Sequence, residues 1–168
     1  MKNALLLVLL LFTSCAAVNK EYERKQSWAV PIEVKGVPNL YKINDMLYRS
    51  GQPTKEGMKS LKEMGIKTVI NLRTLHSDTS EAGATGLRLE HVNAKPWHPE
   101  DEDVIAVMRI LSKSENSPFL IHCRKGSDRT GFMCAMYRIV YQDWSKEDAL
   151  DEMIKGGYGY NPFWKPIK

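Results

Sequence analysis

The sequence predicts an α/β domain with three α-β-α layers, in which a central, largely parallel sheet is flanked by helices. First, short apolar runs of strand length alternate with segments whose apolar residues recur at helical spacing. Second, 168 residues suffice for one domain with a substantial core and leave little room for another. Third, 43% hydrophobic and 26% charged residues exclude a disordered chain and a polytopic membrane protein.

The N-terminus has the pattern of an export signal, and we expect residues 1–14 to be a signal peptide. Lys2 precedes an apolar run over residues 4–12 that is too short to span a bilayer. Cys15 lies where bacterial lipoprotein signals, which this segment resembles, place the lipidated cysteine, although Phe12 replaces their usual Leu. Cys15 is therefore either lipidated, which anchors the chain to a membrane, or removed by cleavage after a following alanine. Both alternatives place the protein outside a bacterial cytoplasm, in the periplasm or secreted.

The rest of the chain divides into an extended arm over residues 15–40 and one domain over residues 41–168. The arm is polar and mixed, and Pro31 and Pro38 oppose a long helix there. The sequence contains no internal repeats and no low-complexity segment.

In the first half of the domain, the sequence predicts a strand, a helix and two further strands, in that order. Residues 46–48 form a short strand and 49–53 a turn, after which Thr54 caps a helix that ends at Gly65. Residues 68–72 form a buried strand, and the alternation over 87–92 is typical of a strand with one wet face. The helix should bury Met58, Leu61 and Met64.

The second half predicts three helices and one strand. A helix follows Pro99, residues 118–121 form a short apolar strand, and residues 129–141 return to helical spacing. The sequence from Ser145 to Asp148 resembles a capping box that opens a last helix. The apolar positions of these helices are Val104, Val107, Met108 and Leu111, then Phe132, Ala135, Met136, Ile139 and Val140, and finally Leu150, Met153 and Ile154.

The segment Ile-His-Cys-Arg-Lys-Gly-Ser-Asp-Arg-Thr-Gly at 121–131 lies between a predicted strand and a predicted helix, where α/β sheets bind ligands. Backbone N–H groups and the positive end of the helix dipole bind phosphate at such a loop. Gly126 lets the loop curl, and Cys123 would direct its sulfur into the ring of donors, which also stabilises a thiolate. Arg129 can chelate two phosphoryl oxygens.

The pattern Cys-x5-Arg, with His122 before it, Gly126 inside it and Thr130-Gly131 after it, resembles the signature loop of the protein tyrosine phosphatase superfamily. Residues 46–153 resemble compact atypical dual-specificity phosphatases and phosphatase-like phytases, including bacterial members with the Tyr-Arg-Ser-Gly-Gln-Pro segment found at 48–53. The resemblance implies that Cys123 attacks phosphorus to form a phosphocysteine, which water hydrolyses. It also implies that Arg129 stabilises both transition states and that no metal or organic cofactor is needed.

The resemblance assigns the other residues of the loop as well. Thr130 would donate a hydrogen bond that helps the thiolate leave, and His122 would orient Cys123. The substrate would contact Arg124, Lys125, Gly126, Ser127, Asp128 and Arg129. From the residues alone, Arg124 and Lys125 are equally well explained as solvated surface, and Asp128 as a residue that orders the loop or pairs with Arg129.

The general acid of the family is usually an Asp on a loop before the helix that precedes the signature strand. No Trp-Pro-Asp triplet occurs in residues 96–103. Counting back from Cys123 without gaps, the resemblance to the compact plant-type enzymes places Asp101 at the position of their candidate acid. Asp101 could equally serve the helix dipole. Glu100, Asp103 and Asp128 remain alternatives.

Three cysteines are too few for a disulfide scaffold and wrongly spaced for a zinc site. We expect Cys134, on the helix after the loop, to be core packing, with a disulfide to Cys123 as the alternative.

Three functions fit the sequence. The favoured one is hydrolysis of inositol polyphosphates such as phytate (inositol hexakisphosphate), because an exported enzyme meets soluble organic phosphates and the chain looks too short for an aromatic phosphotyrosine-recognition loop. The alternatives are a phosphotyrosine or dual-specificity protein phosphatase and an inactive phosphate-binding module. The net charge of +4 suits anionic small molecules and gives no basic stripe for nucleic acid. The larger phytase-like members have a Thr-Asp-His stretch that residues 93–95 lack.

Overall fold

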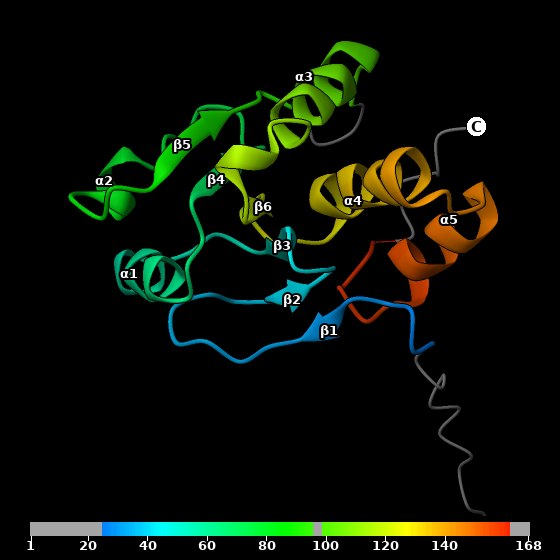
Figure 1. The fold of residues 1–168 in the computed structure, drawn as a ribbon, viewed down its shortest axis with the longest axis horizontal. Helices are drawn as coiled ribbons and strands as arrows, with labels where there is room; N and C mark the ends of the chain where they lie inside the picture. Colours follow the sequence, from blue (N-terminus) through cyan, green and yellow to red (C-terminus); the bar gives the residue numbers. More distant parts are fainter. Residues whose placement is uncertain (1–24, 96–98, 162–168) are drawn as a thin grey trace, which may run out of the picture.

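The computed structural model describes residues 25–95 and 99–161 and has the predicted α/β architecture (Figure 1). Six strands form one sheet in the order β1-β2-β3-β6-β4-β5. The four strands β3, β6, β4 and β5 are parallel, and the two short strands β1 and β2 extend the β3 edge in antiparallel fashion. The strands are β1 (Val30–Pro31), β2 (Tyr41–Lys42), β3 (Leu47–Ser50), β4 (Thr68–Asn71), β5 (Arg88–His91) and β6 (Phe119–His122).

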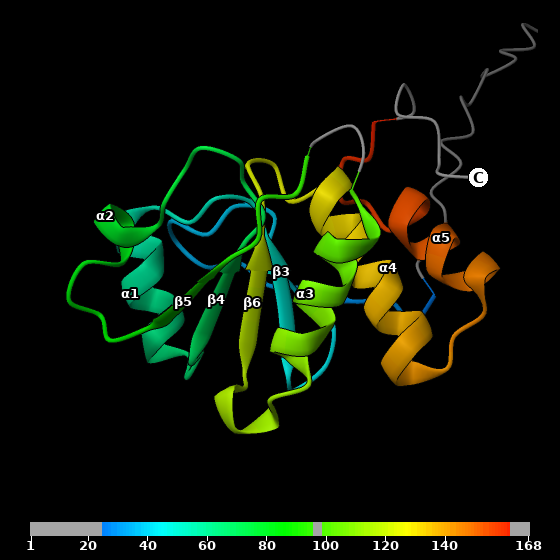
Figure 2. The same cartoon turned by 90° about the horizontal axis from the view of Figure 1, so that it is seen from above.

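Helices cover both faces of the sheet, which makes three layers. Figures 1 and 2 show α1 and α2 on one face and α3, α4 and α5 on the other. A single 3-10 turn, Ser114–Asn116, precedes β6. The helices are α1 (Lys55–Glu63), α2 (Thr79–Ala82), α3 (Asp101–Leu111), α4 (Asp128–Gln142) and α5 (Lys146–Lys155). Within the described residues, no helix is long and apolar enough to cross a membrane.

Apolar side chains of the sheet form one cluster on each face. One cluster joins Ile70 and Ile121 to Met133 of α4, and the other joins Val69 and Leu120 to Leu61 of α1. Because successive side chains of a strand point to opposite faces, β4 and β6 supply both clusters and are buried throughout. The central strand β6, which precedes the predicted loop, is therefore held rigidly on both sides.

Two helix caps form where the sequence predicts them, at Thr54 and Ser145, and a third forms where no cap was predicted. Thr54 Oγ1 accepts a hydrogen bond from Gly57 N at 3.1 Å, and Ser145 Oγ accepts one from Asp148 N at 3.0 Å. Glu100 and Asp103 form a reciprocal capping box at the start of α3. Each cap satisfies backbone donors that the first helical turn leaves unpaired.

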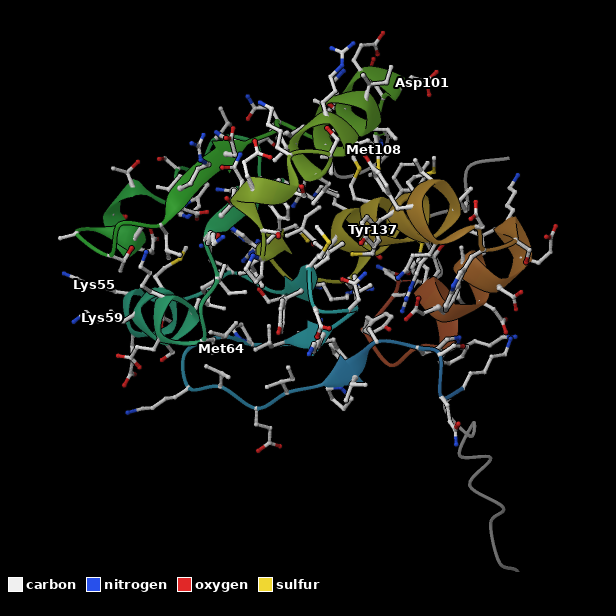
Figure 3. The ribbon with its side chains drawn as sticks, viewed as in Figure 1. Lys55, Lys59, Met64, Asp101, Met108 and Tyr137 are labelled. Atoms are coloured by element: carbon white, nitrogen blue, oxygen red, sulfur yellow. The ribbon has the colours of Figure 1, made fainter. Side chains whose placement is uncertain are left out.

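Several local predictions are wrong. Arg49 and Ser50 belong to β3 and not to a turn, because both pair with β6. Met64 is 37% exposed at the end of α1 (Figure 3), and Val140 and Ile154 are 50% and 43% exposed. Each of these three residues lies at the margin of the apolar stripe of its helix, where the side chain meets solvent.

The described part of the predicted arm, residues 25–40, lies against the domain and contributes β1. Trp28, Ala29, Val37 and Leu40 are buried, and Ile32 N donates to Leu40 O at 2.9 Å. The apolar side chains of this part of the arm therefore belong to the core of the domain. The predicted signal peptide and Cys15 lie outside the described residues.

Candidate active site

The segment that follows β6 forms a loop that leads directly into α4 at the carboxyl ends of the parallel strands (Figure 2). Cys123 is the first residue after β6 and is 3% exposed. Gly126 N donates to Cys123 Sγ at 3.3 Å, so that the loop curls around the sulfur as predicted. A backbone donor aimed at sulfur stabilises the thiolate form of a cysteine.

Gly126 is required at its position for two reasons. Its φ of +76° lies in the left-handed region that other residues rarely adopt. A Cβ atom there would lie 2.5 Å from Gly51 N and from the Ser50 carbonyl. The loop is therefore packed directly onto the end of β3, which explains why β3 matters to the site.

Arg129 lies in the first turn of α4, and its guanidinium reaches across to the ends of the neighbouring strands. Its Nη1 atom donates to Leu72 O at 3.0 Å and to Ala94 O at 3.3 Å. Leu72 follows β4, which pairs with β6, so these carbonyls hold the guanidinium beside the loop. A planar guanidinium fixed in this way can bind two oxygens of a phosphoryl group.

His122 ends β6 and is fully buried. Its Nε2 atom lies 2.7 Å from Asp78 Oδ2, and its Nδ1 atom lies 3.4 Å from Cys123 O. Burial alone would raise the pKa of the Asp78 carboxyl, but the hydrogen bond and charge of His122, together with Gln52 and His76, hold that pKa below its ordinary value. Asp78 is consequently ionised, and His122 Nε2 donates to it. The ring of His122, which we predict to orient Cys123, is thus itself held by the buried carboxylate of Asp78.

A polar chain extends from this pair toward the surface. Gln52 Nε2 donates to Asp78 Oδ1 at 2.8 Å, and Arg73 Nη1 donates to Gln52 Oε1 at 2.8 Å. Sequence reasoning missed Asp78, because it lies 44 residues before His122 in a polar segment that has no pattern of its own. It missed Arg49 too, whose guanidinium is buried beneath the loop and donates to Gly126 O at 2.7 Å. The Tyr-Arg-Ser-Gly-Gln-Pro segment was the available signal for Arg49 and Gln52.

Thr130 is fully buried, and among the described residues its hydroxyl has no hydrogen-bond partner. A buried hydroxyl without a partner is uncommon and calls for an explanation. Thr130 lies in the first turn of α4, directly after Arg129, and the predicted hydrogen bond from its hydroxyl to Cys123 Sγ is not formed in this structure.

The other loop residues divide into exposed and engaged side chains. Arg124 and Lys125 are exposed at the mouth of the loop. Ser127 is buried and donates to Asp128 Oδ2 at 3.2 Å, while Asp128 Oδ1 accepts from Asn161 N at 3.0 Å. Asp128 thus ties the loop to the chain after α5.

The acidic candidates before α3 differ in what they contact. Glu100 forms an ion pair with Lys95 at 2.7 Å, and Asp103 accepts from Glu100 N at 3.1 Å. Asp101 is exposed at the first residue of α3 (Figure 3), and within the described residues its side chain forms no hydrogen bond or ion pair. Residues 96–98, which adjoin this segment, lie outside the described residues.

Cys134 is 4% exposed in the core cluster of α4, and both Cys123 and Cys134 are free thiols. Burial raises the pKa of Cys134 to about 11. Cys134 is therefore packing, as predicted, and the alternative of a disulfide with Cys123 is not formed in this structure.

One trio of metal-ligating residue types gathers in the described part of the chain. His76, Asp78 and Glu81 have ligand atoms within 4.8 Å of one another. Both carboxylate oxygens of Asp78 already accept hydrogen bonds, from Gln52 and His122. The trio is accordingly an extension of the polar chain beneath Cys123.

Comparisons with known proteins agree with this geometry. The chain is 35% identical over 137 residues to the dual specificity protein phosphatase TpbA of Pseudomonas aeruginosa, which covers 81% of this chain and 62% of TpbA. It is 30% identical to the inositol diphosphatase DSP5 of Arabidopsis thaliana, over 70% of this chain and 61% of that protein. The chain therefore spans about three fifths of the length of these relatives.

Solved structures show the same fold. A crystal structure of TpbA superimposes with a TM-score of 0.76 at 32% identity and covers 84% of this chain and 86% of that one. A substituted TpbA crystallised with phosphotyrosine gives a TM-score of 0.74 at 33% identity, over 82% and 83% of the two chains. Residues 38–157 match the family model described as DSP-PTPase phosphatase fused to NAD+ kinase, and the chain belongs to this family.

Proposed function

We propose that this protein is a cysteine-dependent phosphomonoester hydrolase that works through a phosphocysteine intermediate. The observation that carries the proposal is the curled loop between β6 and α4, in which a backbone N–H lies 3.3 Å from Cys123 Sγ. Such a loop binds a phosphoryl group by its N–H groups and by the dipole of the 15-residue helix α4.

The reaction takes two displacements at phosphorus. In the first, the Cys123 thiolate forms a P–S bond while the P–O bond to the leaving group breaks, and an acid gives that oxygen its proton. In the second, water attacks phosphorus, loses a proton to the same group and releases the thiolate with inorganic phosphate. Arg129 binds the phosphoryl oxygens in both steps, and Thr130 donates to the departing sulfur.

Asp101 is the proposed acid. The alternatives each have a structural partner, since Glu100 binds Lys95, Asp103 caps α3 and Asp128 binds Asn161 N. Asp101 has none among the described residues and lies at the end of α3. We expect Asp101→Asn to slow turnover of an alkyl phosphate by about 10²- to 10⁴-fold and to affect nitrophenyl phosphate less, because nitrophenolate leaves without a proton. Equal losses with both substrates would exclude Asp101.

Inositol polyphosphate is the proposed substrate. Arg124 and Lys125 are exposed side by side at the mouth of the loop. The partly buried Arg73 donates to the side chain of Gln52, whose backbone N donates to Arg124 O at 3.3 Å. Several cations around one phosphate site favour a substrate that carries further phosphates on the same compact ring. The relative DSP5 is named for an inositol diphosphate substrate.

A phosphotyrosine protein is the second candidate. It is favoured by TpbA, which is named a dual specificity protein phosphatase and was crystallised in complex with phosphotyrosine. The same Cys123 chemistry serves both candidates. The two candidate substrates differ only in the part of the molecule that lies outside the loop.

A phosphate-release panel separates the candidates. It compares inositol hexakisphosphate, lower inositol phosphates, an inositol diphosphate and phosphotyrosine peptides. Cys123→Ser is the blank, and Cys134→Ser is the matched control, because it changes the other buried thiol of the domain without touching the loop. Faster turnover of the peptides would reverse our order of candidates. Full activity of Cys123→Ser would refute the mechanism.

We also propose that the protein acts outside a bacterial cytoplasm, either anchored through a lipid on Cys15 or free after cleavage. Support comes from the charged start and apolar run of residues 1–12. Mass spectrometry of the mature N-terminus is the test. A chain that keeps Met1 would contradict export.

A further inference from the structure

Arg49 is a cation buried on β3 without a counter-ion in the described part of the chain. The residue is 1% exposed, and no described carboxylate forms an ion pair with it. Nη2 donates to Gly126 O at 2.7 Å and more weakly to Ser127 O at 3.4 Å. The ring of Tyr158 covers the guanidinium, with Cζ 3.6 Å from the ring centroid. A charge buried in this way costs free energy unless something nearby compensates for it.

The contrast with Arg138 shows what an ordinary buried arginine looks like in this fold. Arg138 is 3% exposed and lies on α4, and its guanidinium is paired with Glu152 through bonds of 2.7 Å and 2.9 Å. Arg49 has carbonyl oxygens and an aromatic face in place of a carboxylate. Its positive charge is therefore left available to an anion in the loop above it.

The two acceptors of Arg49 fix the direction of two peptide planes. In a planar trans peptide the N–H points opposite to the C=O. Because the carbonyls of Gly126 and Ser127 point to Arg49, the N–H groups of Ser127 and Asp128 point away from it. The N–H of Gly126, one position earlier, donates to Cys123 Sγ. The Ser127 carbonyl also accepts from Gly131 N at 2.7 Å within α4, so the helix itself orients the Asp128 amide. Arg49 holds the amide before it, that of Ser127, in the orientation that an anion above Cys123 requires.

We propose that Arg49 is a positioning residue for the oxyanion site: it orients the Ser127 amide from behind and supplies a buried positive charge. This inference rests on the proposed phosphatase function of the loop. It extends that function to a residue on another strand, which contacts neither the nucleophile nor the substrate.

The test measures binding of inorganic phosphate to the full chain by calorimetry and by amide NMR. We expect Arg49→Met to weaken phosphate binding by about 10- to 100-fold, because bonds to a charged group are lost. We also expect phosphate to shift the amide proton signals of Ser127 and Asp128 in the wild type, and the shift of Ser127 to disappear in Arg49→Met. Arg49→Lys keeps the charge and loses the forked geometry, so it should recover part of the affinity.

Arg138→Met is the matched control, because it removes an equally buried arginine whose hydrogen-bond partners, Glu152, Gln142 and Ser27, all lie outside the loop. It should destabilise the fold and leave phosphate affinity and the two amide shifts unchanged. Wild-type affinity in Arg49→Met, or equal losses in the Arg49 and Arg138 variants, would overturn the positioning role. If Arg49→Met fails to fold, Arg49→Lys with unchanged affinity and shifts would overturn it. A wild type that does not bind phosphate would refute the proposed function itself, and this inference with it.

Discussion

Asp78 is the residue whose replacement tests most directly how the site is held together. Its side chain is 2% exposed and accepts bonds from His122 Nε2 at 2.7 Å and from Gln52 Nε2 at 2.8 Å. An Asn side chain has the same shape but only one acceptor oxygen. In Asp78→Asn, one of the two donors must therefore face the new NH2 group.

The expected loss follows from that count. A hydrogen bond to a charged group contributes about 1.5–3 kcal/mol, so we expect Asp78→Asn to lower the free energy of unfolding by about 2 kcal/mol. Asp78→Leu leaves His122 with no partner on Nε2 and should cost about 3–5 kcal/mol. Because the His122 ring is then no longer fixed next to Cys123, we expect kcat/KM of Asp78→Asn to fall by about 10- to 100-fold.

The assays are urea unfolding at neutral pH and phosphate release per folded molecule. The control is Glu81→Gln, which removes the same charge three residues further along the chain, from a side chain that contacts His76 and not His122. Glu81→Gln should stay within about 0.5 kcal/mol of the wild type and keep its activity. If Asp78→Asn behaves like Glu81→Gln, the buried carboxylate does not support the nucleophile and our reasoning is wrong.

Three further predictions concern the loop, the α4–α5 pair and the second thiol. Gly126→Ala should lose about 10²-fold in activity, because the new Cβ would collide with Ser50 and Gly51. The control is Gly65→Ala: Gly65 has φ +88°, but nothing lies within 4 Å of an added Cβ, so this variant should lose stability alone. Similar activities of the two variants would contradict the contact with Ser50 and Gly51. Burial would raise the pKa of Glu152, but Arg138, Ala29 N and Tyr158 hold it below the ordinary 4.5. The stability that the Arg138–Glu152 pair contributes is therefore fully present above about pH 5 and is lost as the pH falls through the lowered pKa. The free energy of unfolding should accordingly fall more steeply with decreasing pH in the wild type than in Glu152→Gln. Parallel plots of this free energy against pH would argue against the pair. Iodoacetamide near neutral pH should label Cys123 and leave Cys134, whose pKa is about 11, unlabelled in the folded protein. Peptide mass spectrometry that finds both thiols modified at one rate would disprove this.

The sequence was enough to predict what is local. The strand, loop and helix around Cys123 follow each other within a few residues, and each has its own signal: an apolar run, a glycine and a helical repeat. The caps at Thr54 and Ser145 are likewise set by neighbours three residues away. These predictions are confirmed because the interactions that decide them lie within one turn of the chain.

Pairings over long distances along the chain could not be predicted. Asp78 meets His122, and Arg49 meets Gly126, only after the sheet has formed. The two-residue strands β1 and β2 are too short to show any alternation, and Arg49 looked like a turn residue because charged side chains are seldom buried. In each case the tertiary environment, and not the local pattern, decides the conformation.

The position of β6 between β3 and β4 has a consequence for the order in which the domain is assembled. Strands β1–β3 and strands β4–β5 are made first along the chain, yet in the described structure the two groups are joined edge to edge only through β6. Non-local pairing of this kind forms late, because the intervening loops must close first. The strand that completes the sheet is also directly followed by Cys123. A chain whose synthesis stops before β6 thus has neither a closed sheet nor Cys123, the proposed nucleophile.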